Sequence, residues 1–162
     1  MSIKVSIDAS GGDFGFPVTI NAGINALMSF SDLHINLVGD EKGIKEELEK
    51  KSIHKSFLDR IEITHASEVI NMHDSPSTAL RHKKDSSMRV AINLVQSGIC
   101  NACVSAGNTG ALMSIARFVL KTIEGVDRPA IMSAVPTLTG PTHVLDLGAN
   151  VDSKPETLLQ FA

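Results

Sequence analysis

Short segments in which apolar and polar residues alternate recur along the chain, and most are followed by a longer amphipathic run. Alternation with many β-branched residues is typical of strands, and apolar residues spaced three and four apart are typical of helices. Six strands are predicted, over 3–8, 33–39, 60–66, 101–107, 129–136 and 142–149. Helices are predicted over 17–30, 41–51, 88–97, 112–123 and 155–162.

Several residues mark where these helices begin. Pro17 fits the first position of a helix, where its missing N–H costs nothing. Asp40 is a natural N-cap for the next helix, and Ser86 or Ser87 can cap the helix that follows at 88. Residues 67–77 are predicted to form a loop, whereas 78–87 fit a helix and a loop equally well.

Strands that alternate with helices predict an α/β fold with a mostly parallel sheet between two layers of helices. The segment "TLTGP" is short enough to join the last two strands as an antiparallel hairpin. The length of 162 residues suits one α/β domain spanning 1–162. The apolar run "PETLLQFA" reads as a helix cut short, so we expect this domain to be the N-terminal part of a longer, truncated protein.

The composition excludes some classes of function. Hydrophobic residues make up 43% of the chain and charged residues 20%, which is typical of globular proteins. The net charge of −3 and the absence of Trp and Tyr argue against a nucleic-acid partner. No apolar run has the length of a membrane span, and no signal-peptide pattern begins the chain, so we expect a cytoplasmic protein.

Cys100 and Cys103 form a C-x-x-C pair. Such a pair can be a redox centre or half of a zinc site. A zinc site needs about four ligands, and neither a second pair nor a histidine motif is present. We therefore expect small buried cysteines and no metal.

Polar and glycine clusters follow three of the predicted strands. In open parallel sheets, ligands bind beyond the carboxyl ends of the strands. The first cluster contains Asp8, Ser10, Gly11, Gly12 and Asp13, the second Ser105, Gly107, Asn108, Thr109 and Gly110, and the third Asp146, Gly148, Asn150 and Asp152. The first two are expected to share one edge of the sheet, and the third joins them if its strand runs the same way.

The second cluster has the best physical reason to bind an anion. Glycines let the backbone approach a ligand closely, and the free N–H groups at the start of a helix point outward. The alternative is that Asn108 or Thr109 caps the helix and the glycines make a tight turn. The spacing of these residues is equally compatible with an anion site and with a capped helix that follows a tight turn. The Walker, dinucleotide-binding and nucleophile-elbow motifs are absent from the chain.

A basic segment lies between the third and fourth predicted strands. It contains Arg81, Lys83, Lys84 and Arg89. Four cations within nine residues can form an anion pocket, although such a run is more often a solvated loop.

Four stretches in order, "DASGGDFG", "SPSTALRHKKDSSM", "ACVSAGNTGALM" and "LDLGANVD", resemble the phosphate acyltransferase family of bacterial phospholipid synthesis. This resemblance implies an enzyme in which inorganic phosphate attacks the thioester of a fatty acyl–acyl carrier protein, giving acyl phosphate and free carrier. It also implies a three-layer fold like that of isocitrate and isopropylmalate dehydrogenases, a homodimer, and no nucleotide or metal cofactor. Peripheral contact with the inner membrane face is expected through the half that this chain lacks.

The resemblance also suggests roles for particular residues. Asn108, Lys84 and Arg81 are expected to be catalytic, with phosphate held at Ser105 and 107–110. Asp8, Gly11, Gly12, Asp13, Asn150 and Asp152 are expected to form the walls of the cleft. Ser10 departs from the family pattern, which usually has Met there.

Two other functions are compatible with the residues. One is a metal-dependent decarboxylating dehydrogenase of the same fold, which would hold Mg²⁺ at Asp146 or Asp152. The other is a non-catalytic module that binds acidic acyl carrier protein through 81–89.

Overall fold

A computed structural model describes residues 2–51, 53–146 and 153–161. Its strands are β1 (Ile3–Asp8), β2 (Leu33–Gly39), β3 (Ile61–His65), β4 (Ala102–Ser105), β5 (Met132–Thr137) and β6 (Gly140–Leu145). Its helices are α1 (Phe16–Ser29), α2 (Glu41–Glu49), α3 (Lys55–Leu58), α4 (Pro76–His82), α5 (Ser87–Gln96), α6 (Thr109–Leu120) and α7 (Pro155–Phe161). They fall into two compact units, 1–120 and 121–162, which are described separately.

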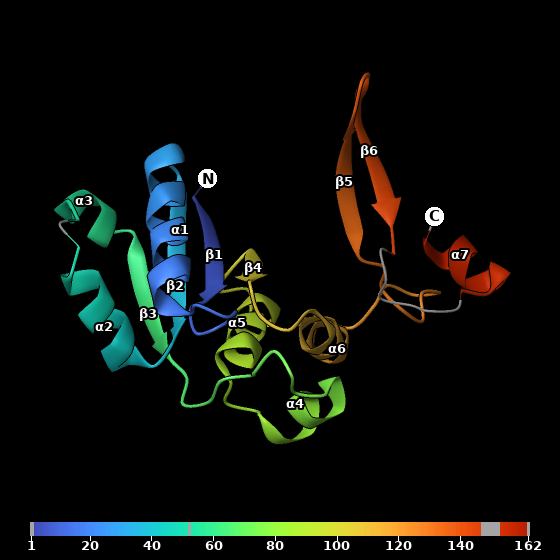
Figure 1. The fold of residues 1–162 in the computed structure, drawn as a ribbon, viewed down its shortest axis with the longest axis horizontal. Coiled ribbons are helices and arrows are strands. Elements are labelled where there is room, and N and C mark those ends of the chain that lie inside the picture. The colour runs from blue at the N-terminus through green and yellow to red at the C-terminus, as the bar shows by residue number, and fades with distance from the viewer. Residues whose placement is uncertain (1, 52, 147–152, 162) are drawn as a thin grey trace. The chain divides into compact units, whose positions relative to one another are not determined.

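The first unit is built on a parallel sheet of four strands in the order β3-β2-β1-β4 (Figure 1). Each neighbouring pair in this sheet is parallel. Helices cover both faces of this sheet, because the connection between parallel strands has to cross over the sheet. The predicted α/β/α class with a mostly parallel sheet is confirmed.

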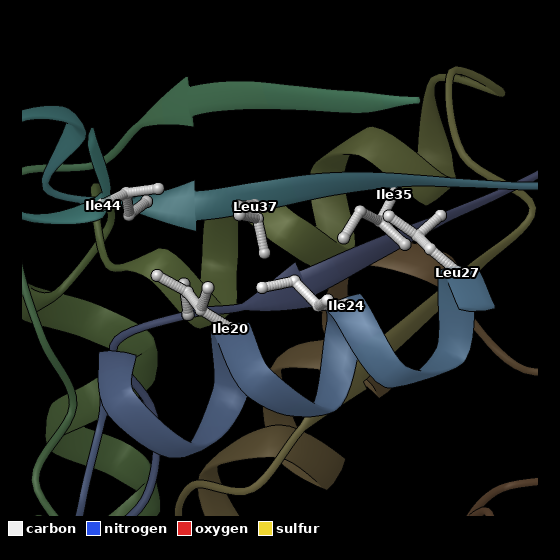
Figure 2. Close-up of a cluster of buried hydrophobic side chains, with 7 residues drawn as sticks. Ile20, Ile24, Leu27, Ile35, Leu37 and Ile44 are labelled. Atoms are coloured by element: carbon white, nitrogen blue, oxygen red, sulfur yellow. The ribbon is translucent and has the colours of Figure 1, made fainter. Parts of the chain in front are cut away.

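One face of the sheet is covered by α1 and α2. Ile20, Ile24 and Leu27 lie on one stripe of α1 and pack against Ile35 and Leu37 of β2 (Figure 2). Their spacing of four and three residues is the period that places side chains on one face of a helix. This cluster is the core that fixes α1 to the sheet.

The other face is covered by α5, with α6 packed against α5 and α4 packed against α6. Ala91 of α5 lies in a buried cluster with Val38 and Ala66. Met88 and Ile92 of the same helix pack with Ile115 of α6 in a further cluster. Through α5, the helices that flank the predicted anion site are therefore fixed to the sheet.

The second unit contains β5, β6 and α7. The two strands pair as an antiparallel hairpin, in which Ser133 lies opposite Val144 and Val135 opposite Thr142. The predicted hairpin is thus confirmed, and it forms a separate two-stranded sheet. Whether the chain is one domain, as expected for 1–162, stays a prediction.

Two of the predicted caps are confirmed, whereas Pro17 lies at the second position of α1, which begins at Phe16. Asp40 accepts a hydrogen bond from Gly43 N at 2.8 Å, and Ser86 is the residue that caps α5. The segment 78–87 contains the end of α4, which begins at Pro76 behind a capping Ser75. Helix α3, of four residues, was not predicted because it is too short for a periodic pattern.

No helix among the described residues is both long and apolar enough to cross a membrane.

Truncating Ile20 tests the core under α1. Ile20 is fully buried, so Ile20→Ala is expected to lower the free energy of unfolding by about 2–5 kcal/mol. Urea denaturation followed by circular dichroism measures this change. Val18→Ala on the same helix is the matched control, because Val18 is 51% exposed, and a change of less than about 0.5 kcal/mol is expected there. Equal effects of the two substitutions would contradict the packing described here.

Candidate anion site at the carboxyl edge of the sheet

The parallel pairing of β1 with β4 brings the first two polar clusters together. In this register Asp8, the last residue of β1, lies opposite Ser105, the last residue of β4. The loop after β1 and the loop after β4 therefore leave the sheet at the same edge. The prediction that these two clusters share an edge is confirmed.

Asp8 is a buried carboxylate at this edge. Its side chain is 1% exposed, and its Oδ2 accepts a hydrogen bond from Ser105 Oγ at 2.7 Å. Its Oδ1 has no hydrogen-bond partner among the described residues. Burial raises the pKa of Asp8 above its usual value, although the hydroxyls of Ser105 and Ser87 and the backbone of Gly11 oppose the shift.

Glycines surround Asp8 because side chains would not fit there. A Cβ on Gly11 would overlap the Asp8 carboxylate. Gly12 has a φ of 85°, and a Cβ there would lie 3.0 Å from the carbonyl oxygen of Ala106. The glycine loop after β1 therefore packs directly on the chain that follows β4, whereas Asp13 is exposed to solvent.

Ser105 links this carboxylate to the turn that leads into α6. Its Oγ donates to Asp8 and accepts a hydrogen bond from Gly107 N at 3.0 Å. Gly107 is buried, and a Cβ there would lie 3.0 Å from the Met88 side chain. Ser105 therefore holds the turn at Gly107 and has its own hydrogen-bonding capacity largely in use.

Asn108 is the N-cap of α6. Its Oδ1 accepts a hydrogen bond from Ala111 N at 3.0 Å. Its Nδ2 donates to the carbonyl oxygens of Met72 and Asp74, each at 2.9 Å, and more weakly to that of Asn71. The Asn108 side chain thus caps the helix, which was one of the two alternatives drawn from the sequence, and it also tethers the loop before α4, which was not foreseen.

Three backbone N–H groups at the start of α6 remain available. Those of Asn108, Thr109 and Gly110 have no hydrogen-bond partner among the described residues. Thr109 is exposed, and Asn108 and Gly110 are partly exposed. The capping alternative is therefore correct for the Asn108 side chain, and the three amides still offer donors to an anion.

In the basic segment, Lys83 is held by hydrogen bonds, whereas Arg81 and Lys84 face solvent. Lys83 donates to Asp74 Oδ2 at 2.7 Å and to the Val69 carbonyl oxygen at 2.6 Å, which fixes the same loop that Asn108 tethers. Arg81 and Lys84 are exposed to solvent. The structure places Arg81 near the end of α4, about 7.5 Å along the helix axis from Pro76.

Pro76 itself lies against the second cluster. A Cβ on Gly110 would be 3.0 Å from its ring, so α4 begins where α6 begins. The ion pair between Lys83 and Asp74 was not predicted, because the two residues lie nine positions apart and belong to no recognisable motif.

Asn150 and Asp152, which were predicted to form the third wall of the cleft, lie outside the described residues.

Two observations on residues 2–51, 53–146 and 153–161 concern metal ligands and thiols. No group of three or more His, Cys, Asp or Glu side chains there could hold a metal ion. Cys100 and Cys103 are free thiols. Burial raises the pKa of both, and that of Cys103 to about 11, so neither has thiolate character at neutral pH.

The carboxyl edge of this α/β sheet thus combines a buried acid, a glycine-lined turn and helix N-terminal amides without a partner among the described residues. A sequence model of the family described as "Fatty acid synthesis protein" matches residues 3–162. The chain belongs to this family.

Several curated relatives are named "Phosphate acyltransferase". The protein of Ruthia magnifica is 66% identical over 162 residues, which is 100% of this chain and 48% of the relative. That of Methylococcus capsulatus is 59% identical over 158 residues, 98% of this chain and 46% of the relative. That of Legionella pneumophila (strain Paris) is 55% identical over 161 residues, which is 99% of this chain and 46% of the relative. The chain thus spans about half the length of these relatives.

Asp8→Asn tests the burial of the carboxylate. A carboxyl group whose pKa is raised by folding stabilises the native state below its unfolded pKa of 3.8, and this stabilisation is lost as the pH rises through the folded pKa. As the pH is raised from about 4 to 8, the free energy of unfolding of Asp8→Asn is therefore expected to increase relative to that of the original protein. Urea denaturation across this range measures the difference.

Asp13→Asn controls for the lost charge in the same loop. A stability difference between Asp8→Asn and the original protein that does not change with pH would show that the buried carboxylate is not penalised by desolvation.

Asn108→Ala tests the double role of the cap. Loss of the cap is expected to lower stability by about 0.5–2 kcal/mol, and loss of the tether to speed hydrogen exchange in 71–74. Asn108→Ser separates the two roles, since serine keeps a capping oxygen but is too short for the tether. Stability of Asn108→Ala equal to that of the original protein would contradict the capping geometry.

Proposed function

We propose that the protein to which this chain contributes about half the length is a phosphate acyltransferase that uses acyl carrier protein. The supporting observation is the set of three unpaired amides at the start of α6, in a chain 66% identical to a relative with that name. Acyl groups are taken from the thioester of a fatty acyl–acyl carrier protein and passed to inorganic phosphate.

The proposed reaction needs no enzyme nucleophile. A phosphate oxygen attacks the thioester carbonyl carbon and forms the new C–O bond. The C–S bond of the tetrahedral intermediate then breaks, and its electron pair leaves on the sulfur of the carrier, which takes up the proton that the hydrogen phosphate loses. The products are acyl phosphate and free carrier, and neither a metal nor a nucleotide is required.

Positioning and electrostatics are then the main tasks of the protein. The amides of Asn108, Thr109 and Gly110 hold the phosphate, because helix N-terminal N–H groups favour an anion. Arg81 and Lys84, exposed on and just after α4, offset the charge of the phosphate and of the intermediate. Orientation of bound reactants can supply about 7–11 kcal/mol of the barrier reduction in favourable cases.

Asp8 and Ser105 have a supporting role in this proposal. Their hydrogen bond, together with that from Gly107 N to Ser105, fixes the turn from which the three amides project. Gly11, Gly12 and Asp13 form the neighbouring wall, and Asn150 and Asp152 are proposed for the opposite one.

The partners follow from the reaction. We propose acyl carrier protein and phosphate as substrates, a homodimer in the cytoplasm, and contact with the inner membrane face through the half absent from this chain. Arg81 and Lys84 also suit the approach of an acidic carrier, since opposite charges steer encounter.

Thr109→Pro tests the amide cradle directly. Proline removes the Thr109 N–H but is tolerated at the first position of a helix, behind a capping residue with extended backbone. Loss of one hydrogen bond to a charged group costs about 1.5–3 kcal/mol, so the KM for phosphate is expected to rise by about 10- to 150-fold.

The measurement uses a completed chain, in which this chain replaces the matched 162 residues of the R. magnifica relative. Formation of acyl phosphate from palmitoyl–acyl carrier protein is followed by the incorporation of ³²P from labelled phosphate. Thr109→Ala, which keeps the N–H and loses only the hydroxyl, is expected to stay within about threefold of the original KM.

Three outcomes contradict the proposal. An unchanged phosphate KM in Thr109→Pro removes the amide cradle. Binding of the carrier without phosphate-dependent deacylation would favour a docking module. Tight binding of NAD together with Mg²⁺ would favour the decarboxylating dehydrogenase.

A further inference from the structure

An apolar groove of about 420 Å³ runs along the sheet beside α1. One wall is a flank of α1 that carries Val18, Ala22 and Ala26, four residues apart, and continues to Phe30. The floor is formed by side chains of β1 and β4, including Val104. The groove is distinct from the three amides of α6, none of whose residues lines it.

The floor of this groove is sheet surface that no helix of the first unit covers. Side chains alternate along a strand, so Ile7 and its register partner Val104 lie on the face of α1, whereas Ser6 and its partner Cys103 lie on the face of α5. Ser6 donates to the Ala91 carbonyl of α5, which confirms this assignment. Val104, on the other face, is 56% exposed.

The walls of the groove are also exposed. Val18 is 51% and Phe30 60% exposed, and Ile3 at the far end of β1 is 47% exposed. A parallel sheet normally has both faces covered by helices, because each strand is buried on both sides. No helix of the first unit covers the α1 side of β1 and β4 at this place.

The edge of the sheet is open at the same place. Among the described strands β4 pairs with β1 and with no other, so its second edge is free to accept a strand. A parallel strand added there has to be connected by a crossover of a dozen or more residues, usually a helix. Such a strand would pair with the open edge of β4, and its helix would cover the exposed apolar face beside it.

We propose that this groove binds a helix from the half of the protein that the family's longer members carry and this chain lacks. The relatives provide the necessary length, since the matched part is 48% of the R. magnifica protein and 46% of two others. The helix presents a stripe of apolar side chains to Val18, Ala22 and Val104. It covers the sheet as α1 covers β2.

Thiol labelling at the groove tests this proposal. Val104→Cys places a thiol on the groove floor, and Leu58→Cys, at the end of α3 and 42% exposed, is the matched control. The two native cysteines label slowly, because burial raises the pKa of each, and mass spectrometry distinguishes the sites. Labelling is compared in this chain alone and in the completed chain.

We expect the thiol introduced by Val104→Cys to label at least about tenfold more slowly in the completed chain than in this chain alone, because a covered site reacts only after local opening. The control thiol should label equally in both. As an independent measure, Ala22→Asp is expected to destabilise the completed chain but not this chain alone, since Ala22 is exposed here.

Equal labelling of the groove thiol in the two proteins would overturn the proposal. Protection already present in this chain alone would also overturn it, by showing that a second copy or another segment covers the groove. Protection that appears only on adding palmitoyl–acyl carrier protein would assign the groove to an acyl chain instead.

Discussion

The register between β1 and β4 is the constraint on which the candidate site depends. It places Asp8 opposite Ser105, and the hydrogen bond between their side chains joins two loops that are nearly a hundred residues apart in sequence. Gly11 and Gly107 have no side chain because the space beside the carboxylate is filled. A shift of one residue in the pairing of β1 with β4 would turn Asp8 to the other face of the sheet and break its hydrogen bond with Ser105.

The burial of Asp8 carries a cost that the fold tolerates. A carboxylate taken out of water and left with one unpartnered oxygen destabilises the native state unless the group is protonated. In return, Ser105 is held in one orientation and in turn holds Gly107. Most side-chain hydrogen-bonding groups at this edge of the sheet are therefore used internally, whereas the backbone amides of Asn108, Thr109 and Gly110 have no partner among the described residues.

Much of this was predictable from the sequence. The period of apolar residues predicted the parallel strands and most helices. The rule that parallel strands end at one edge predicted that the clusters containing Asp8 and Ser105 share that edge. Local patterns could not show what the Asn108 side chain does, since its partners in 71–74 lie on another loop. Nor could they separate Lys83, which pins that loop, from the exposed Arg81 and Lys84. Short elements such as α3 carry too few residues for a period to be seen.

We propose that the amides at the start of α6 bind an inorganic oxyanion. Titration of phosphate into the ¹⁵N-labelled chain, followed by NMR, reports on each amide separately. We expect saturable shifts that are largest at Thr109 and Gly110, with the amide resonances of α1 unchanged. The proposal would be contradicted if these two resonances did not move at phosphate concentrations that shift amides elsewhere in the chain.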